Sequence, residues 1–107
     1  MADELNDIIA NVDKNYRKGV FYSEKSLYLT LGDSEDLKFT IFAGPDGVRV
    51  EKGKAIGNAD CVLKTKPDLF IKMVKGEYMP GMMDFMRGLV KTNDPDLLMK
   101  FKEALNF

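Results

Sequence analysis

The apolar positions near the N-terminus recur at helical spacing. In residues 2–19, ADELNDIIANVDKNYRKG, this spacing predicts a helix with one apolar face. The side chains on that face are Leu5, Ile8, Ile9, Val12 and Tyr16. Acidic residues stand at the start of this segment, and Lys14, Arg17 and Lys18 precede Gly19. Carboxylates stabilise the N-terminal end of a helix dipole and cations the C-terminal end. We therefore expect one helix over residues 2–19.

The period then changes to two, which is typical of strands with one apolar face. The segments with this pattern are residues 26–32 (SLYLTLG), 36–42 (DLKFTIF), 48–53 (VRVEKG) and 60–65 (DCVLKT). The polar run GDSED separates the first two strands, and GPDG suits a type I turn before the third. The simplest arrangement is an antiparallel meander of three or four strands.

Helical spacing returns after Pro67, a residue suited to a first helical turn. The apolar stripe of this helix ends before Gly76 and consists of Leu69, Phe70, Met73 and Val74. Pro80 is placed to begin a second short helix that ends at Gly88.

The C-terminal segment predicts one more strand and one more helix. Residues 88–93, GLVKTN, form the strand, and Asp94 and Pro95 begin the helix. Its inward positions are Leu98, Phe101 and Leu105. The order α-β-β-β-β-α-α-β-α predicts an α+β fold with a five-stranded, mostly antiparallel sheet covered by helices. The chain length of 107 residues fits a single domain, residues 1–107.

Composition narrows the function. Sixteen basic residues against seventeen acidic ones argue against nucleic-acid binding, which depends on cations. The chain has no histidine and only one cysteine, so catalytic histidines, a disulfide within the chain and cysteine-rich metal sites are excluded. We expect no catalytic residue, no metal and no cofactor. The start MADELNDI lacks the pattern of a secretory signal, and we expect a cytoplasmic protein.

The remaining chemical candidates have simple structural interpretations. The acidic run DSED lacks the glycine and distal glutamate of a calcium loop. Cys61 lies in a predicted strand without a histidine to activate it, which is typical of a core residue. Lys72 and Lys75 are more typical of a solvated helix face than of a site for a lipid headgroup.

Methionine is concentrated in one segment. Five of the seven methionines lie within residues 73–86, interrupted by glycine and proline. Methionine fills gaps in a core, and that interpretation is the commoner one. It also lines sites that adapt to variable apolar ligands, so a flexible wall over a cavity is the alternative.

From Asp60 onward the chain resembles the sterol carrier protein-2 family of lipid-transfer domains. The segments that carry the resemblance are ADCVLKT, PDLFIKMVKGE with Leu69 and Gly76, DFMRGLVKTND with Phe85 and Gly88, and PDLLMKF with Leu98. The first sixty residues agree in element order alone. Asn93 stands where the family often has glycine, and the end EALNF lacks the peroxisomal tripeptide of many eukaryotic members.

The resemblance implies an apolar tunnel that binds or transfers fatty acids, acyl-CoA, sterols or isoprenoids without catalysis. By analogy, the residues that line it are Phe70, Met73, Val74, Met79, Met82, Met83, Phe85, Met86, Leu98, Phe101 and Leu105. The expected partner is a lipid or acyl chain, with no nucleic acid. Transient contact with a membrane surface and a homodimer remain open.

Energetics are consistent with a lipid site. Ten buried methylenes contribute about 8 kcal/mol before ordering costs, which corresponds to roughly micromolar affinity. Two other classes of function stay open: an accessory or dimerisation module that works with an enzyme and binds no exchanging lipid, and an enzyme whose chemistry comes from a cofactor or a partner subunit.

Overall fold

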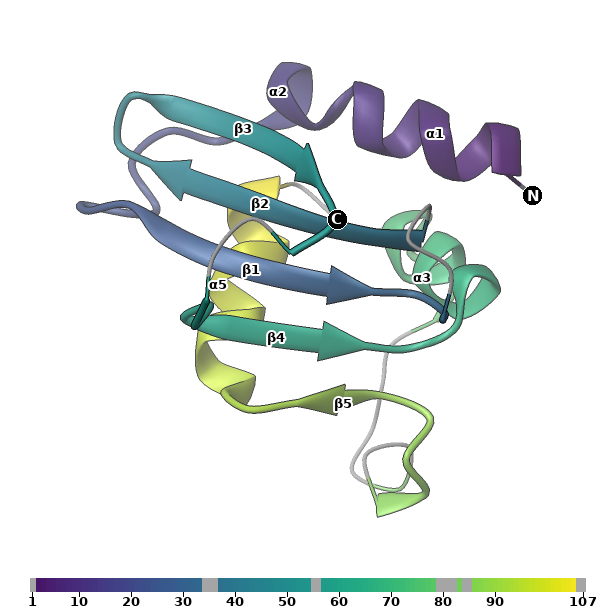
Figure 1. Ribbon diagram of the computed structural model, residues 1–107. Helices are drawn as coiled ribbons and strands as arrows, with labels where there is room; N and C mark the ends of the chain where they lie inside the picture. The colour runs from purple at the N-terminus through teal and green to yellow at the C-terminus, as the bar shows by residue number, and fades with distance from the viewer. Residues whose placement is uncertain (1, 34–36, 55–56, 79–82, 84–85, 106–107) are drawn as a thin grey trace.

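A five-stranded sheet with helices packed on one face forms the architecture (Figure 1). The computed structural model describes residues 2–33, 37–54, 57–78, 83 and 86–105. The elements are, in chain order, α1 (Ala2–Ala10), α2 (Val12–Asn15), β1 (Lys25–Thr30), β2 (Lys38–Gly44), β3 (Gly47–Lys52), β4 (Cys61–Lys64), α3 (Pro67–Val74), β5 (Lys91–Thr92) and α5 (Pro95–Leu105). The predicted α+β class and the mostly antiparallel sheet are confirmed.

The strands lie in the order β3-β2-β1-β4-β5. Strands β1, β2 and β3 form an antiparallel meander, but β4 pairs with the opposite edge of β1 and runs parallel to it. The three-stranded meander is therefore correct and the four-stranded one is wrong. After β3 the chain crosses the face of the sheet that carries Tyr28, where Lys54 Nζ lies 5.8 Å from the Tyr28 ring centroid.

Hydrogen bonds at the start of β4 fix this parallel pairing. The backbone N–H and the hydroxyl of Ser26 donate to Asp60 Oδ2 at 2.9 and 3.2 Å, and the Asp60 N–H donates to Ser26 Oγ at 3.0 Å. The backbone of β1 and the chain entering β4 are thus joined before the ladder begins. The side chain of Asp60 thus helps to select β1 as the partner of β4. The alternation of apolar residues does not predict this pairing.

The N-terminal helix is interrupted, contrary to the prediction of one helix over residues 2–19. Asn11 separates α1 from α2, and its side-chain Nδ2 donates to the Asp7 carbonyl at 2.8 Å. Tyr16 has an extended backbone, with ψ of 130°, and its hydroxyl donates to the Gly44 carbonyl at 2.6 Å. This long-range bond ends the helix at Asn15, so Arg17 lies outside the helix whose C-terminal end it was expected to stabilise.

The core lies between the sheet and the helices. Leu27 and Leu29 of β1 face it, because they pair in register with apolar positions of β2 and β4. Figure 1 shows α3 and α5 behind the sheet, with α1 and α2 near the β3 edge. The rings of Phe21 and Phe101 pack with centroids 4.8 Å apart. Each of these buried leucines and aromatics is at most 4% exposed.

The last strand is shorter than the predicted residues 88–93. Strand β5 contains two residues, and Asn93 follows with its Oδ1 accepting the Val62 N–H at 2.8 Å. The amide side chain thus replaces a backbone carbonyl at the end of the ladder. The short helix expected between Pro80 and Gly88 falls largely outside the described residues. In the described part of the chain, no helix is long and apolar enough to cross a membrane.

Candidate functional site

Helix α3 directs two of the predicted lining residues into the core. Phe70 is 1% exposed and Met73 is 4% exposed, whereas Val74 is half-buried at the edge of the helix. Pro67 begins the helix, and Gly76 follows its last turn with a φ of 76°. The left-handed backbone at Gly76 ends the helix before the methionine-rich segment.

Helix α5 contributes the other buried positions of the predicted site. Leu98, Phe101 and Leu105 all belong to the hydrophobic core. Its first turn is held by Asp94, whose carboxylate accepts the Leu97 N–H at 3.1 Å. The buried residues of α3 and α5 thus form an apolar wall within the core cluster that also contains the strands.

The methionine-rich segment has a different environment from the wall. Met83 is 57% exposed and Met86 is 75% exposed. Met79, Met82 and Phe85, also predicted to line the site, lie outside the described residues. The two placed methionines thus present apolar surface to solvent, unlike Met73, which is packed in the core.

A groove opens between α1, α2, α3 and the end of α5. Its volume is about 220 Å³. Val74 and Leu105, both predicted lining residues, form part of its wall together with Ile8 and Val12. This groove thus contains residues of the predicted tunnel wall. It is therefore the candidate site for an apolar ligand.

Charged side chains border one end of the groove. Lys75 of the turn after α3 forms an ion pair with Glu4 of α1. Its hydrogen bond to Glu4, and then the negative charge of that carboxylate, raise the pKa of Lys75. Lys72 and Lys75 also line an adjoining hollow of about 300 Å³. The apolar groove therefore has both signs of charge at its mouth.

The sequence interpretation missed the contribution of α1 and α2 to this groove. Periodicity places Ile8 and Val12 on the apolar face of a helix, but the predicted lining does not include them. Val12 is 1% exposed, while Ile8 is half-buried and remains accessible from the groove. Helical periodicity identifies such a face, but only the packing of α1 against α3 shows that a gap remains beside it.

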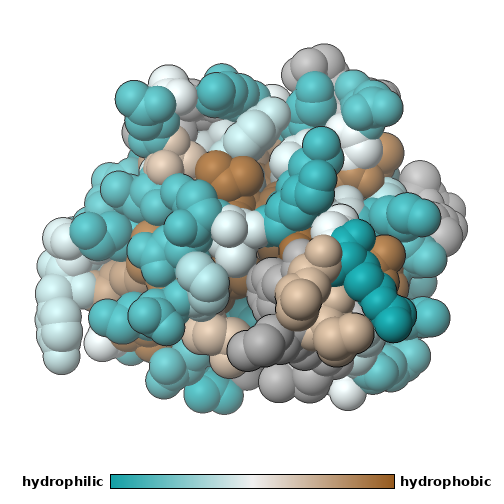
Figure 2. Space-filling view, turned by 90° about the horizontal axis from the view of Figure 1, so that it is seen from below, coloured by the Kyte–Doolittle hydropathy of each residue, from teal (hydrophilic) through white to brown (hydrophobic). Residues whose placement is uncertain are grey.

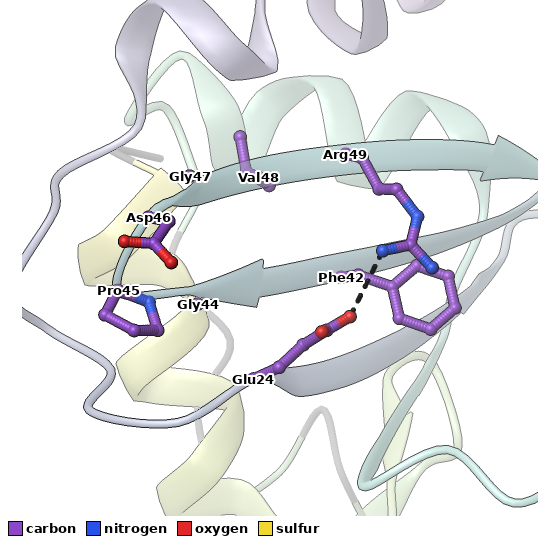
Figure 3. Close-up of a pocket in the computed structure, with 8 residues that line it drawn as sticks. All are labelled: Glu24, Phe42, Gly44, Pro45, Asp46, Gly47, Val48 and Arg49. Atoms are coloured by element: carbon purple, nitrogen blue, oxygen red, sulfur yellow. Dashed lines mark hydrogen bonds and ion pairs between the residues drawn. The ribbon is translucent and has the colours of Figure 1, made fainter.

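A second hollow lies at the turn between β2 and β3 (Figure 3). It measures about 320 Å³. The Arg49 guanidinium carbon lies 4.0 Å from the centroid of the Phe42 ring, and Arg49 pairs with Glu24 at 3.3 Å. The stacked, paired arginine covers an otherwise exposed aromatic ring, which is a structural role. None of the predicted lining residues contributes to this hollow.

Cys61 is fully buried, in agreement with its interpretation as a core residue. Its Sγ lies 3.6 Å from Thr92 Oγ1 and 3.7 Å from the Asp94 carbonyl oxygen. Burial raises the pKa of the thiol above its ordinary value of 9.0, and the nearby Asp94 carboxylate raises it further. The thiol is therefore protonated near neutral pH, in a site that links β4 to the start of α5.

The sequence relationship of the chain agrees with this arrangement. A model of the SCP-2 sterol transfer family matches residues 5–106. The chain belongs to this family. The resemblance predicted from the segment after Asp60 is confirmed, and the match extends it through the N-terminal helices and the meander. Membership supports lipid binding as the class of function. No curated protein matches the chain in sequence.

Solved structures share the fold. The UbiJ-SCP2 ubiquinone synthesis protein superposes with a TM-score of 0.63 at 16% identity, covering 94% of this chain and 90% of that one. Palmitated SCP2L2 from Aedes aegypti gives a TM-score of 0.58 at 14% identity, covering 97% and 92%.

An enzyme also contains this fold as one part of a longer chain. The sec-alkylsulfatase Pisa1 from Pseudomonas sp. gives a TM-score of 0.70 at 14% identity over 90% of the present chain. The present chain spans 15% of the length of that sulfatase. At these identities the likenesses show the fold alone. The fold thus occurs both as nearly a whole chain and as a small part of a larger one.

Proposed function

We propose that this chain binds a lipid non-covalently, with the acyl or isoprenoid chain held against the helical wall, and that it carries or presents this lipid without catalysis. The observation that supports the proposal is the apolar groove between α1, α3 and α5 in a member of the SCP-2 family. Val74 and Leu105 belong to this groove. A cytoplasmic location and a homodimer remain part of the proposal.

The proposed lining extends from the groove along the wall and the methionine-rich segment. Phe70, Met73, Leu98 and Phe101 are buried in the core. The exposed Met83 and Met86 are available to cover a ligand without first leaving the core. The proposed contribution of Met79, Met82 and Phe85 rests on their sequence positions. Flexible methionines suit this role because they repack around chains of different shape.

An anionic headgroup of the ligand would pair with Lys75, which lines the groove beside the carboxylates of Glu4 and Asp7. Lys75 already holds one carboxylate, that of Glu4, and both side chains are about half exposed. A fatty-acid carboxylate or an acyl-CoA phosphate would replace Glu4 as the partner of Lys75. The charge-reversal variant Lys75→Glu should then weaken binding of a fatty acid more than binding of the corresponding fatty alcohol. Equal weakening of both would exclude this headgroup contact.

The first experiment is denaturing extraction of gently purified protein followed by mass spectrometry of the released small molecules. A stoichiometric fatty acid, acyl-CoA, sterol or isoprenoid would establish an occupied site and define the ligand class. The site itself is tested with a fluorescent fatty acid and the variant Val74→Phe, which fills the groove. We expect at least roughly tenfold weaker binding, because a ring would occupy the space of about two methylenes of ligand.

The matched control is Tyr22→Phe, because Tyr22 is 93% exposed and lies outside the groove. It should bind the probe as tightly as the unmodified protein. Unchanged binding of the probe to Val74→Phe would show that the ligand binds outside this groove. An empty extract together with no binding of the fluorescent probe would overturn lipid binding itself.

A second candidate is an accessory module that works beside an enzyme and holds no exchanging lipid. The likeness to the UbiJ-SCP2 ubiquinone synthesis protein over nearly its whole length favours this alternative. It predicts an empty extract and a stable complex with a partner enzyme, whereas the carrier predicts ligand exchange between vesicles. An equilibrium between monomer and dimer that is independent of lipid would also support the module.

A further inference from the structure

Exposed apolar side chains gather at one edge of the molecule. Met83, Met86 and Leu89 are 57%, 75% and 38% exposed, and they lie within seven positions of one another. Figure 2 views the molecule from the side of β5 and shows apolar surface next to strongly hydrophilic side chains. Large apolar groups left in water near one another mark a contact surface more often than isolated ones do.

Beside these side chains lies a hollow of about 240 Å³. It opens where β1 and β4 end and where the chain turns into β5. Its base includes Leu31, which is 1% exposed, and one wall is Leu89. The Thr65 hydroxyl donates to the Leu89 carbonyl at 2.9 Å, so the turn is tied to the end of β4. The hollow is thus part of the rigid sheet edge, with an apolar interior.

Lysines surround this hollow. Among the described residues that line it, Lys64, Lys66 and Lys91 stand beside the carboxylate of Asp33. All three lysines are exposed, and none forms an ion pair within the described ranges. Arg87 is exposed next to Gly88, another lining residue. In a chain with a net charge of −1, cations thus outnumber carboxylates among the described residues around this hollow.

We propose that this edge, formed by Lys64, Lys66, Lys91, Met83, Met86 and Leu89, docks the protein on an anionic lipid bilayer. Cations near a surface of acidic lipids each add about 1 kcal/mol of attraction, and apolar side chains add to it by entering the interface. A second copy of the chain fits this surface poorly. A two-fold contact would place the same lysines against one another, and like charges disfavour such an interface.

The test is co-sedimentation with phosphatidylcholine vesicles that contain or lack phosphatidylglycerol. The unmodified protein should bind the anionic vesicles, and binding should fall as salt is raised. The variant Lys64→Glu/Lys66→Glu/Lys91→Glu should weaken binding at least about 100-fold. The matched control is Lys14→Glu/Lys18→Glu/Lys100→Glu, which makes the same change in net charge at exposed sites elsewhere. It should weaken binding by less than about tenfold.

The apolar contribution is tested separately. The variant Met86→Ser/Leu89→Ser should lower vesicle binding by roughly tenfold, because it removes apolar area from the docking edge. Met99→Ser is its control, since Met99 is 54% exposed on α5 and lies outside the hollow. Circular dichroism and thermal unfolding of each variant confirm that the fold is retained before vesicle binding is compared.

Several outcomes would overturn the docking surface. They are equal weakening by the two lysine triples, equal binding to vesicles with and without phosphatidylglycerol, and no vesicle binding at all. A dimer that Met86→Ser/Leu89→Ser converts to monomer, with vesicle binding unchanged, would assign the edge to self-association. The docking edge shares Met83 and Met86 with the proposed lining, but its three lysines lie outside that lining. The lysine triple should therefore lose vesicle binding while it binds the fluorescent fatty acid normally in the assay without vesicles.

Discussion

The carboxylate of Asp60 accepts two hydrogen bonds from Ser26, thirty-four positions earlier in the chain. Ser26 is buried and also accepts the Asp60 N–H. This reciprocal pair joins the beginnings of β1 and β4, which are parallel neighbours at the centre of the sheet. The Asp60 carboxylate therefore accepts hydrogen bonds from the backbone and the hydroxyl of Ser26, and the Ser26 hydroxyl accepts one from the backbone of Asp60, just before the β1–β4 ladder begins.

Replacing Asp60 by alanine should lower the free energy of unfolding by about 1–3 kcal/mol, because the Ser26 donors would lose their acceptor. Urea denaturation of Asp60→Ala, Ser26→Ala and the double variant measures the coupling between the two residues. We expect the double variant to cost less than the sum of the single variants. Strict additivity would show that the pair does not act as a unit.

Stability should fall at alkaline pH because of Cys61. Burial raises the pKa of its thiol in the folded protein, so folding favours the protonated form. The contribution of this thiol is therefore fully present below its ordinary pKa of 9.0 in the unfolded chain, and is lost as pH rises through the higher folded pKa. The midpoint of urea denaturation should drop more for the unmodified protein than for Cys61→Ala between about pH 8 and 10. Parallel pH profiles for the two proteins would contradict this prediction.

Gly76 is required for its backbone conformation. Its φ is 76°, and a Cβ added there would meet no atom within 4 Å. Gly76→Ala should therefore cost about 1–2 kcal/mol of unfolding free energy through backbone strain alone. Gly57→Ala is the control, because Gly57 also faces open space but lies outside the left-handed region. Thermal unfolding should separate the two variants, and similar stabilities would argue that the turn after α3 relaxes at little cost.

The methionines should divide into two groups in stability measurements. Met73→Ala should cost about 2–5 kcal/mol, since it leaves a cavity where a buried side chain was packed. Met83→Gln and Met86→Gln should each change stability by less than about 0.5 kcal/mol, because both side chains are exposed. Chemical denaturation of the three variants provides the comparison. A large loss in Met86→Gln would mean that this side chain is packed in solution.

Much of the fold follows from periodicity. The spacing of apolar residues placed α3 and α5 almost to the residue, since Pro67 and Pro95 suit first helical turns and both stripes face the sheet. Alternation likewise located the strands, because one face of each meets the core. The interruption at Asn11 and the end of the helix at Asn15 escaped prediction. The end at Asn15 depends on Tyr16 reaching Gly44, a partner twenty-eight positions away, whereas the interruption accompanies the bond from the Asn11 side chain to the Asp7 carbonyl.

The sequence by itself determined the class of the fold, the inward side chains of α3 and α5, and the family, because local spacing and residue order carry this information. Tertiary structure decided the pairing of β4 with β1, the groove beside Val74 and the lysines that surround Leu89. Each of these joins segments that are distant in the chain. Local patterns specify which face of an element is apolar, but the neighbour of that face depends on long-range hydrogen bonds and packing.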